Sequence, residues 1–182
     1  MNSFDEQPMR AALAAQSATS SKASWFAAYT RPRHEQRVAA QLAERQIASF
    51  LPTYKSARRW KDRRKLLELP LFPSYLFVQM KSENRLELLR LPGMVGLVCF
   101  QGKPAPVATV EIENLRLAGT LAVRPHPFLR AGRKVRIRSG SLAGVEGIFV
   151  RKRDTARLVL SISLLQRSVA VEIDDADVEP IE

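Results

Sequence analysis

The chain has a single cysteine among its 182 residues, so no intramolecular disulfide can form. Such sparse cysteine is typical of a protein that works in a reducing compartment. The one thiol, Cys99, lies in the apolar run of residues 95–100. This setting favours a buried structural thiol over a nucleophile.

Long hydrophobic runs are also missing. No apolar stretch approaches the roughly 20 residues that a membrane-spanning helix needs. The N-terminal residues include Asp5 and Glu6 and only a short Ala-rich patch, which makes a poor signal peptide. We therefore expect a cytoplasmic protein with no membrane partner.

The residue patterns of enzymes are scarce. His34 lies in a basic segment and His126 lies between two prolines, so neither has a partner at a useful spacing. The sequence contains no phosphate-binding glycine loop and no nucleophile–base pair. The acidic run DDAD, residues 174–177, indicates a solvated turn rather than a metal site. We expect a protein that is not an enzyme and that needs no cofactor and no metal.

Positive charge is abundant and uneven. The net charge is +11, and residues 25–110 hold 15 Lys or Arg against 6 Asp or Glu. Residues 128–182 hold 10 basic against 8 acidic residues. The first half is therefore the part expected to meet a polyanion such as DNA or RNA. The alternative is a basic surface that serves only solubility.

The pattern of the first half predicts a mixed α+β fold. Residues 1–24, rich in Ala, Ser and Gln, are expected to form a disordered leader. SWFAAYT then predicts a strand in which Trp25, Ala27 and Tyr29 share one face. A helix is predicted over residues 31–49, with Pro32 in its first turn.

Further elements complete this first domain, residues 25–119. A helix over residues 82–93 would use Ser82 as its N-cap, and another, TVEIENLRLAG, would end before Gly119. The order strand–helix–strand–strand–helix–strand–helix predicts an antiparallel sheet flanked by helices, an α+β sandwich.

Two stretches of the first domain stand out. RRWKDRRK, residues 58–65, places six basic residues around Trp60 and predicts an extended hairpin tip, because such a run cannot enter a core. ELPLFPSYLFVQM, residues 68–80, is apolar but carries Pro70 and Pro73, which cannot donate to a sheet ladder. This second stretch predicts an apolar surface kept for a partner, or a segment that simply enters the core late.

The second half reads as pure β structure. Residues 120–128, TLAVRPHPF, contain two prolines and no periodicity, and predict a linker. Beyond them, residues 129–182 hold five short alternating strands with glycines at the turns. Five strands in this length suit a small closed β-barrel.

Two sets of residues resemble one known family. WFAAYTRPRHEQRVAAQLAERQIASFLP followed by LFPSYLFVQM resembles the N-terminal domain of NusG-type transcription elongation factors, called NGN. LRAGRKVRIRSGSLAGVEGIFV followed by LVLSISLLQRSVAVEI resembles their C-terminal KOW domain, a five-stranded SH3-like barrel. The details YTRPR and LFPSYLFV are similar to the specialised paralogues of the RfaH and UpxY type.

The resemblance implies a function. Family members of this kind bind the clamp of elongating RNA polymerase and suppress pausing or premature termination, often for particular operons. The resemblance implies that an apolar concavity of the N-terminal domain holds the clamp. Here it would be lined by Tyr29, Phe50, Pro52, Tyr54, Phe72, Pro73 and Tyr75. Aromatic rings beside prolines give the rigid apolar area that an interface anchor needs. The alternative places Phe72 and Phe77 in the core, which is the stronger expectation for Phe77.

The basic residues suggest a contact with upstream or non-template DNA. Cationic side chains would contact phosphates, and Trp60 could stack on an unpaired base. The candidates are Arg31, Arg33, Arg37, Arg58, Arg59, Trp60, Lys61, Arg63 and Arg64. The alternative is a solvated loop with Trp60 packed on its own domain.

In the family, the KOW domain recruits either the termination factor Rho or a small-subunit ribosomal protein. The matching positions are Leu142, Val145, Leu164, Leu165 and Arg167. The four apolar positions are aliphatic where the housekeeping factor tends to have aromatics, which disfavours Rho and favours a ribosome link or no such partner. We expect a monomer that acts by binding alone. The alternative function is that of a ribosome-associated RNA-binding protein, which the nearly neutral C-terminal half disfavours.

Overall fold

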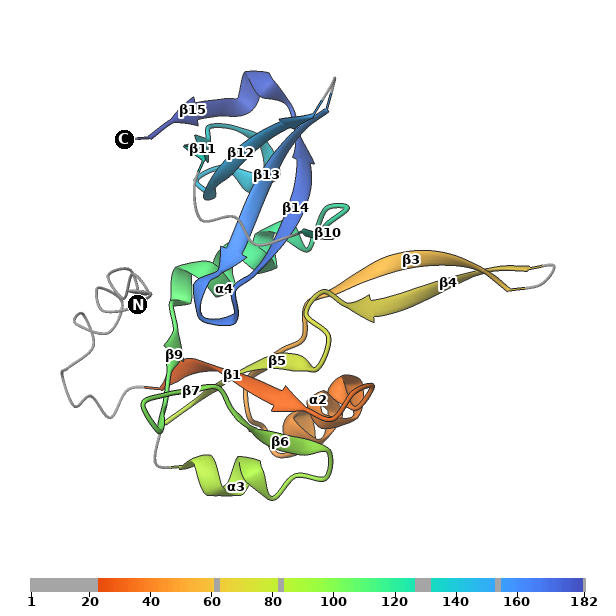
Figure 1. The fold of residues 1–182 in the computed structure, drawn as a ribbon, viewed down its shortest axis with the longest axis vertical. Coiled ribbons are helices and arrows are strands. Elements are labelled where there is room, and N and C mark those ends of the chain that lie inside the picture. Colours follow the sequence, from red (N-terminus) through yellow and green to blue (C-terminus); the bar gives the residue numbers. More distant parts are fainter. Residues whose placement is uncertain (1–22, 61–62, 82–83, 127–131, 153–154, 182) are drawn as a thin grey trace, which may run out of the picture.

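The computed structural model describes residues 23–60, 63–81, 84–126, 132–152 and 155–181. Figure 1 shows two bodies of sheet joined through one helix, with a long hairpin that extends to one side. The elements of the first body are β1 (Ser24–Thr30), α2 (Glu35–Glu44), β2 (Ser49–Phe50), β3 (Thr53–Trp60), β4 (Arg63–Pro70), β5 (Tyr75–Met80), α3 (Arg85–Leu89), β6 (Met94–Leu97), β7 (Cys99–Phe100), β8 (Lys103–Pro104), β9 (Pro106–Val107) and α4 (Thr109–Ala118).

The first body is built on one antiparallel sheet, the N-terminal sheet. Its strand order is β2-β5-β1-β6, and β9 also pairs with β1. In the central pair, Ser24 lies opposite Met80 and Tyr29 lies opposite Tyr75. The predicted mixture of antiparallel sheet and helices is confirmed.

The two faces of β1 are covered by different elements. Phe26 and Ala28 pack with α2 and α3 in one buried cluster. Trp25 and Ala27 face the other way, into a cluster that includes α4. The predicted alternation along this strand is confirmed, and it places the odd-numbered residues on the face that α4 covers.

Helix α2 is shorter than predicted. Arg33 has a positive φ of 64°, so the chain turns there and the helix begins at Glu35. Pro32 therefore lies outside the first turn, where it had been expected. At the other end, Gln46 has φ 56° and Ile47 N–H donates to Leu42 O at 2.9 Å, which is a Schellman ending.

The other two helices lie where the sequence placed them, with small shifts. Asn84 precedes α3, while Ser82, the predicted N-cap, falls outside the described residues. Helix α4 ends at Ala118 with Gly119 after it, as predicted. Ile112, Leu115 and Ala118 form its buried face.

The second body is a six-stranded antiparallel sheet, the C-terminal sheet, where five strands had been predicted. Its order is β10-β14-β13-β12-β11-β15, and among the described residues no pairing joins β10 to β15, so the sheet does not close. Its strands are β10 (Arg124–His126), β11 (Arg133–Ile137), β12 (Glu146–Lys152), β13 (Thr155–Ile162), β14 (Arg167–Ile173) and β15 (Val178–Pro180). Short 3-10 turns, η2 (Gly140–Leu142), η3 (Ser163–Leu165) and η4 (Asp175–Asp177), connect them.

The sixth strand comes from the segment predicted as a linker. Arg124–His126 pairs with β14, although the stretch lacks any alternation of apolar and polar residues. Pro125 fixes its own φ, and it restricts the preceding residue to extended conformations. A proline-containing segment can thus serve as an edge strand without the usual sequence pattern.

The cysteine is not where it was expected. Cys99 is exposed, and its thiol lies 3.3 Å from Leu97 O. The apolar run around it forms two short strands, β6 and β7, rather than one buried strand. The prediction of a buried structural thiol is therefore wrong.

Candidate interaction surfaces

Two tyrosines form the centre of the predicted apolar surface on the N-terminal sheet. Tyr29 and Tyr75 lie opposite each other on β1 and β5, with ring centroids 5.2 Å apart. Tyr29 is 39% exposed and Tyr75 is half-buried. Each tyrosine is thus partly open to solvent.

The connection before β5 is fixed by a buried carboxylate that the sequence did not reveal. Glu35 is 5% exposed, and its Oε1 accepts the Ser74 backbone N–H at 2.7 Å. Ser74 O in turn accepts Thr30 N–H at 2.8 Å. These bonds hold the turn at Ser74, with its positive φ of 68°, and so place Tyr75 beside Tyr29.

The phenylalanines of this surface are more deeply packed. Phe50 is half-buried and stacks on Phe77 at 6.3 Å between centroids. Phe72 is 1% exposed and packs edge-on against Phe77 at 5.8 Å. The expectation that Phe72 lies in an open surface is therefore wrong for this conformation, while Phe77 is in the core as expected.

The three remaining positions differ from one another. Pro73 is exposed and Tyr54 is half-buried. Pro52 is buried, and its carbonyl accepts Leu71 N–H at 2.9 Å, so it holds the start of the hairpin β3–β4. The structure thus gathers Tyr29, Phe50 and Tyr75 on one side of the sheet and uses Pro52 and Phe72 as support.

An arginine of α4 lies over this aromatic group. The Arg116 guanidinium carbon is 4.7 Å from the Trp25 ring centroid and 5.2 Å from that of Phe50. Cation–π attraction at such distances contributes roughly 0.5–2 kcal/mol. Arg116 therefore helps to hold α4 on the sheet, a role that only the side-chain geometry reveals.

The C-terminal sheet packs against the same surface. A single buried cluster contains Trp25 and Phe77 of the N-terminal sheet, Leu115 of α4, and Leu158 and Ile162 of the C-terminal sheet. Tyr75, Phe50, Leu164 and Leu165 pack on its edge. The two predicted partner surfaces, one from each half of the chain, therefore adjoin the same core.

Polar contacts between the two bodies reinforce this packing. The Arg167 guanidinium carbon lies 5.4 Å from the Tyr75 ring centroid. Ser163 N–H donates to Glu111 Oε1 at 3.2 Å, and burial raises the pKa of the Glu111 carboxyl. A contact between Arg167 and Tyr75 joins one residue from each predicted partner surface.

The predicted apolar rim of the C-terminal sheet is partly core. Leu142, at the end of η2, and Val145, which follows it, are both buried in the shared core cluster. Leu164 and Leu165 are half-buried and Arg167 is exposed apart from its contact with Tyr75. The expectation of an exposed rim is therefore wrong for Leu142 and Val145 in this conformation.

The basic run forms the predicted hairpin. In the ladder of β3 and β4, Arg59 lies opposite Arg64 and Trp60 opposite Arg63, and Figure 1 shows the hairpin extending away from both sheets. Arg58 also lies in β3, whereas Lys61 falls outside the described residues. The structure describes no side chains between residues 58 and 65. The ladder nevertheless brings basic positions of both strands together at one end.

Of the other three basic candidates, Arg31 and Arg33 lie between β1 and α2, and Arg37 lies in the first turn of α2. Arg31, Arg33 and Arg37 are all exposed. Arg31 N–H donates to Gly93 O at 2.9 Å, which fixes the backbone of the turn while its side chain remains at the surface. These residues belong to the first body but to a different element from the hairpin.

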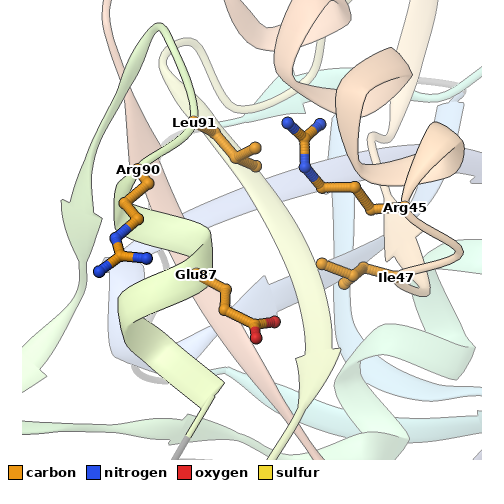
Figure 2. Close-up of a pocket in the computed structure, with 5 residues that line it drawn as sticks. All are labelled: Arg45, Ile47, Glu87, Arg90 and Leu91. Atoms are coloured by element: carbon orange, nitrogen blue, oxygen red, sulfur yellow. The ribbon is translucent and has the colours of Figure 1, made fainter.

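A shallow pocket lies on the opposite face of the N-terminal sheet. Its volume is about 320 Å³, and it is lined by Arg45, Ile47, Glu87, Arg90 and Leu91. Figure 2 shows Ile47, Leu91 and Glu87 pointing into it, while the Arg90 guanidinium turns away. Nothing in the sequence singled out these residues together, because they come from two distant segments, one just after α2 and the other in and just after α3.

Within the described ranges, no cluster of three or more His, Cys, Asp or Glu could hold a metal ion. No helix of the described part of the chain is long and apolar enough to cross a membrane.

A family model described as "Transcription termination factor nusG" matches residues 23–116, which is more than half of the chain. The chain belongs to the NusG family. Its first body, with the tyrosine pair and the basic hairpin, corresponds to the matched region.

Curated relatives extend the similarity over both halves. The Transcription termination/antitermination protein NusG of Buchnera aphidicola is 27% identical over 177 residues, covering 88% of this chain and 97% of the relative. The protein of the same name from Thermus thermophilus is 26% identical over 178 residues, covering 85% and 96%. A solved structure described as "Domain interaction in Thermotoga maritima NusG" has the same fold, with a TM-score of 0.52, 24% identity and coverage of 88% and 98%.

Proposed function

We propose that this NusG-family protein is a transcription elongation and antitermination factor that binds the clamp of elongating RNA polymerase. The observation that carries the proposal is the tyrosine pair, Tyr29 and Tyr75, on the face of the matched region next to Phe50. Rigid aromatic rings with accessible hydroxyls are typical anchors of protein interfaces. The protein acts in the cytoplasm by binding alone, and it suppresses pausing or termination.

Polymerase binding requires the C-terminal sheet to move away from this surface. Arg167 lies on Tyr75, and Leu164 and Leu165 adjoin the cluster that Phe50 and Tyr75 border. A clamp element seated on the tyrosines would occupy the space of these side chains. The described conformation is thus a closed form, and the active form is an open one.

The hairpin β3–β4 contacts upstream or non-template DNA. Its backbone register brings Arg58, Arg59 and Arg64 to one end, beyond the sheet that binds the clamp. Lysines and arginines at a hairpin end neutralise phosphates without reading sequence. Arg31, Arg33 and Arg37 contribute a second exposed basic element of the same body.

The C-terminal sheet is a KOW domain, with β10 added to its five-stranded core. Leu164, Leu165 and Arg167 form its partner surface in the open form, with Leu142 and Val145 beneath as support. The partner is a small-subunit ribosomal protein rather than Rho, since the surface is aliphatic. The segments YTRPR and LFPSYLFV support the proposal that the protein is a specialised paralogue for particular operons.

Co-purification with core RNA polymerase tests this proposal. The tagged protein should recover polymerase, and Tyr29→Ala/Tyr75→Ala should lower the recovery about tenfold or more, since anchor residues contribute about 2 kcal/mol each. Val110→Ala/Leu117→Ala is the matched control, because both side chains are exposed and apolar but lie on α4 outside the proposed surface. Recovery of ribosomes without polymerase would overturn the proposal and favour a ribosome-associated RNA-binding protein.

A further inference from the structure

The short strand β10 decides how far the two sheets can separate. It follows α4 after only five residues, 119–123, and this connection is held by its own hydrogen bonds. Leu121 N–H donates to Ala118 O, and Val123 N–H donates to Leu121 O, both at 2.9 Å. While β10 stays on β14, the C-terminal sheet is tied to the end of α4.

Release of β10 would lengthen this tether about threefold. The chain between α4 and β11 comprises residues 119–132, of which the five residues before β10 span at most about 17 Å when extended. All fourteen residues would span at most about 47 Å. The pairing of the three residues of β10, together with the burial of Val123 before them, therefore sets the length of the tether.

The pairing itself is the weaker of the two ladders that β14 forms. Along its other edge β14 pairs with β13 over seven residues, from Ile173 opposite Ala156 to Arg167 opposite Ile162. Strand β10 covers only Ser168, Val169 and Ala170. Its central residue, Pro125, has no N–H to donate, and Arg124 and Pro125 are exposed. Loss of β10 would thus leave β14 held in the sheet by its long ladder.

We propose that β10 is a detachable clasp, and that the β14 edge it covers accepts an extended strand from a protein partner. Strand β10 shows what kind of ligand this edge binds, because β10 is itself a short extended segment paired antiparallel with β14. Addition of a strand to a sheet edge is a common mode of peptide recognition. A partner strand that replaces β10 allows the C-terminal sheet to separate from the N-terminal sheet. Conversely, when the two sheets separate with release of β10, the edge of β14 becomes available to a partner strand.

A distance measurement on the whole chain tests the clasp. One spin label goes on Cys99, which is exposed and is the only cysteine, and the other on Lys134→Cys, an exposed position of β11. The strand variant is Arg124→Gly/Pro125→Gly/His126→Gly. The control, Leu121→Gly/Ala122→Gly, adds flexibility to the connection but keeps every paired residue.

We expect one narrow distance distribution for the parent and the control, and a broad one reaching longer distances for the strand variant. A narrow distribution in the strand variant, or equal broadening in the control, would overturn the proposal. Loss of the amide dispersion of the C-terminal sheet in the strand variant would overturn it as well, since β10 would then be a part of the fold rather than a clasp.

A peptide tests the acceptor edge. The probe is the synthetic peptide LAVRPH, the sequence of residues 121–126. At millimolar concentration it should shift the amide signals of Ser168, Val169 and Ala170 in the strand variant and not in the parent. Absence of shifts in the variant, or shifts elsewhere, would refute the acceptor edge. Neither measurement contains polymerase, so a failure here leaves the proposed function standing, and the reverse also holds.

Discussion

The contact between Arg167 and Tyr75 offers a direct measure of how firmly the two sheets are held together. Its geometry, a guanidinium carbon 5.4 Å from the ring centroid, corresponds to roughly 0.5–1 kcal/mol for a partly solvated pair. Arg167→Ala removes this attraction only in the closed form. Opening should therefore become more frequent by a factor of about two to five.

Amide hydrogen exchange measures this increase in the open population even when the open form is rare. The Ser163 N–H donates to Glu111 of α4, so this bond breaks when the sheets separate. Its exchange rate should rise about two- to fivefold in Arg167→Ala, since exchange follows the opening equilibrium. The Val98 N–H, which donates to Ala27 O within the N-terminal sheet, should exchange at an unchanged rate.

The matched control is Arg133→Ala, which removes the same charge from an exposed position of β11. If this variant accelerates the Ser163 N–H as much as Arg167→Ala does, net charge rather than the ring contact holds the sheets together. If Val98 accelerates equally, the whole protein is destabilised. An unchanged Ser163 rate in Arg167→Ala would refute the reasoning outright.

Three further predictions test other parts of the structure. Because burial raises the pKa of Glu111 in the closed form, the stabilisation of closure by the protonated carboxyl is complete below the ordinary carboxylate pKa and is lost as pH rises through the raised pKa. The opening equilibrium should therefore increase across that pH window, as measured by exchange of the Ser163 N–H corrected for its intrinsic rate. Glu111→Gln should remove this pH dependence. Gly147→Ala should lower the stability of the C-terminal sheet by about 1–3 kcal/mol in thermal melting, since the added Cβ would lie 2.7 Å from Val159 O. The control Gly96→Ala, whose Cβ would have no neighbour within 4 Å, should change stability little. Equal melting temperatures of the two variants would contradict this account. Arg59→Ala/Arg64→Ala, which change opposite residues of the hairpin, should weaken DNA binding and reduce the slope of log affinity against log salt by about 1–2, and an unchanged slope would remove the hairpin from the DNA contact.

The sequence predicted the elements whose signal is local. Alternation along β1 identified its two faces, and the charge of residues 58–65 identified a hairpin end that no core could accept. These predictions succeed because each depends on the residue's own segment. The same holds for the end of α4 at Gly119.

Apart from the start of α2, where the local turn at Arg33 excludes Pro32 from the helix, the main errors concern contacts between distant segments. Phe72, Leu142 and Val145 are ordinary apolar residues in their own segments, and only the approach of other elements decides whether they are open or buried. Strand β10 lacks any alternation, since a proline-containing edge strand depends on its partner for its position. Glu35 gave no signal either, because its acceptor role arises from the turn at Ser74, far along the chain.

The residue types between the N-terminal and C-terminal sheets suit a protein that adopts both a closed and an open form. A surface made only of phenylalanine and leucine would be costly to expose in the open form and would favour aggregation. Tyr29 and Tyr75 instead combine rings that pack with polar hydroxyl groups, and Arg167 is exposed at the sheet surface. Glu111 adds a carboxylate that burial disfavours, so closure is held below its possible strength. The closed form thus brings the two proposed partner surfaces together, and the contacts that maintain it are weak enough for a partner to break.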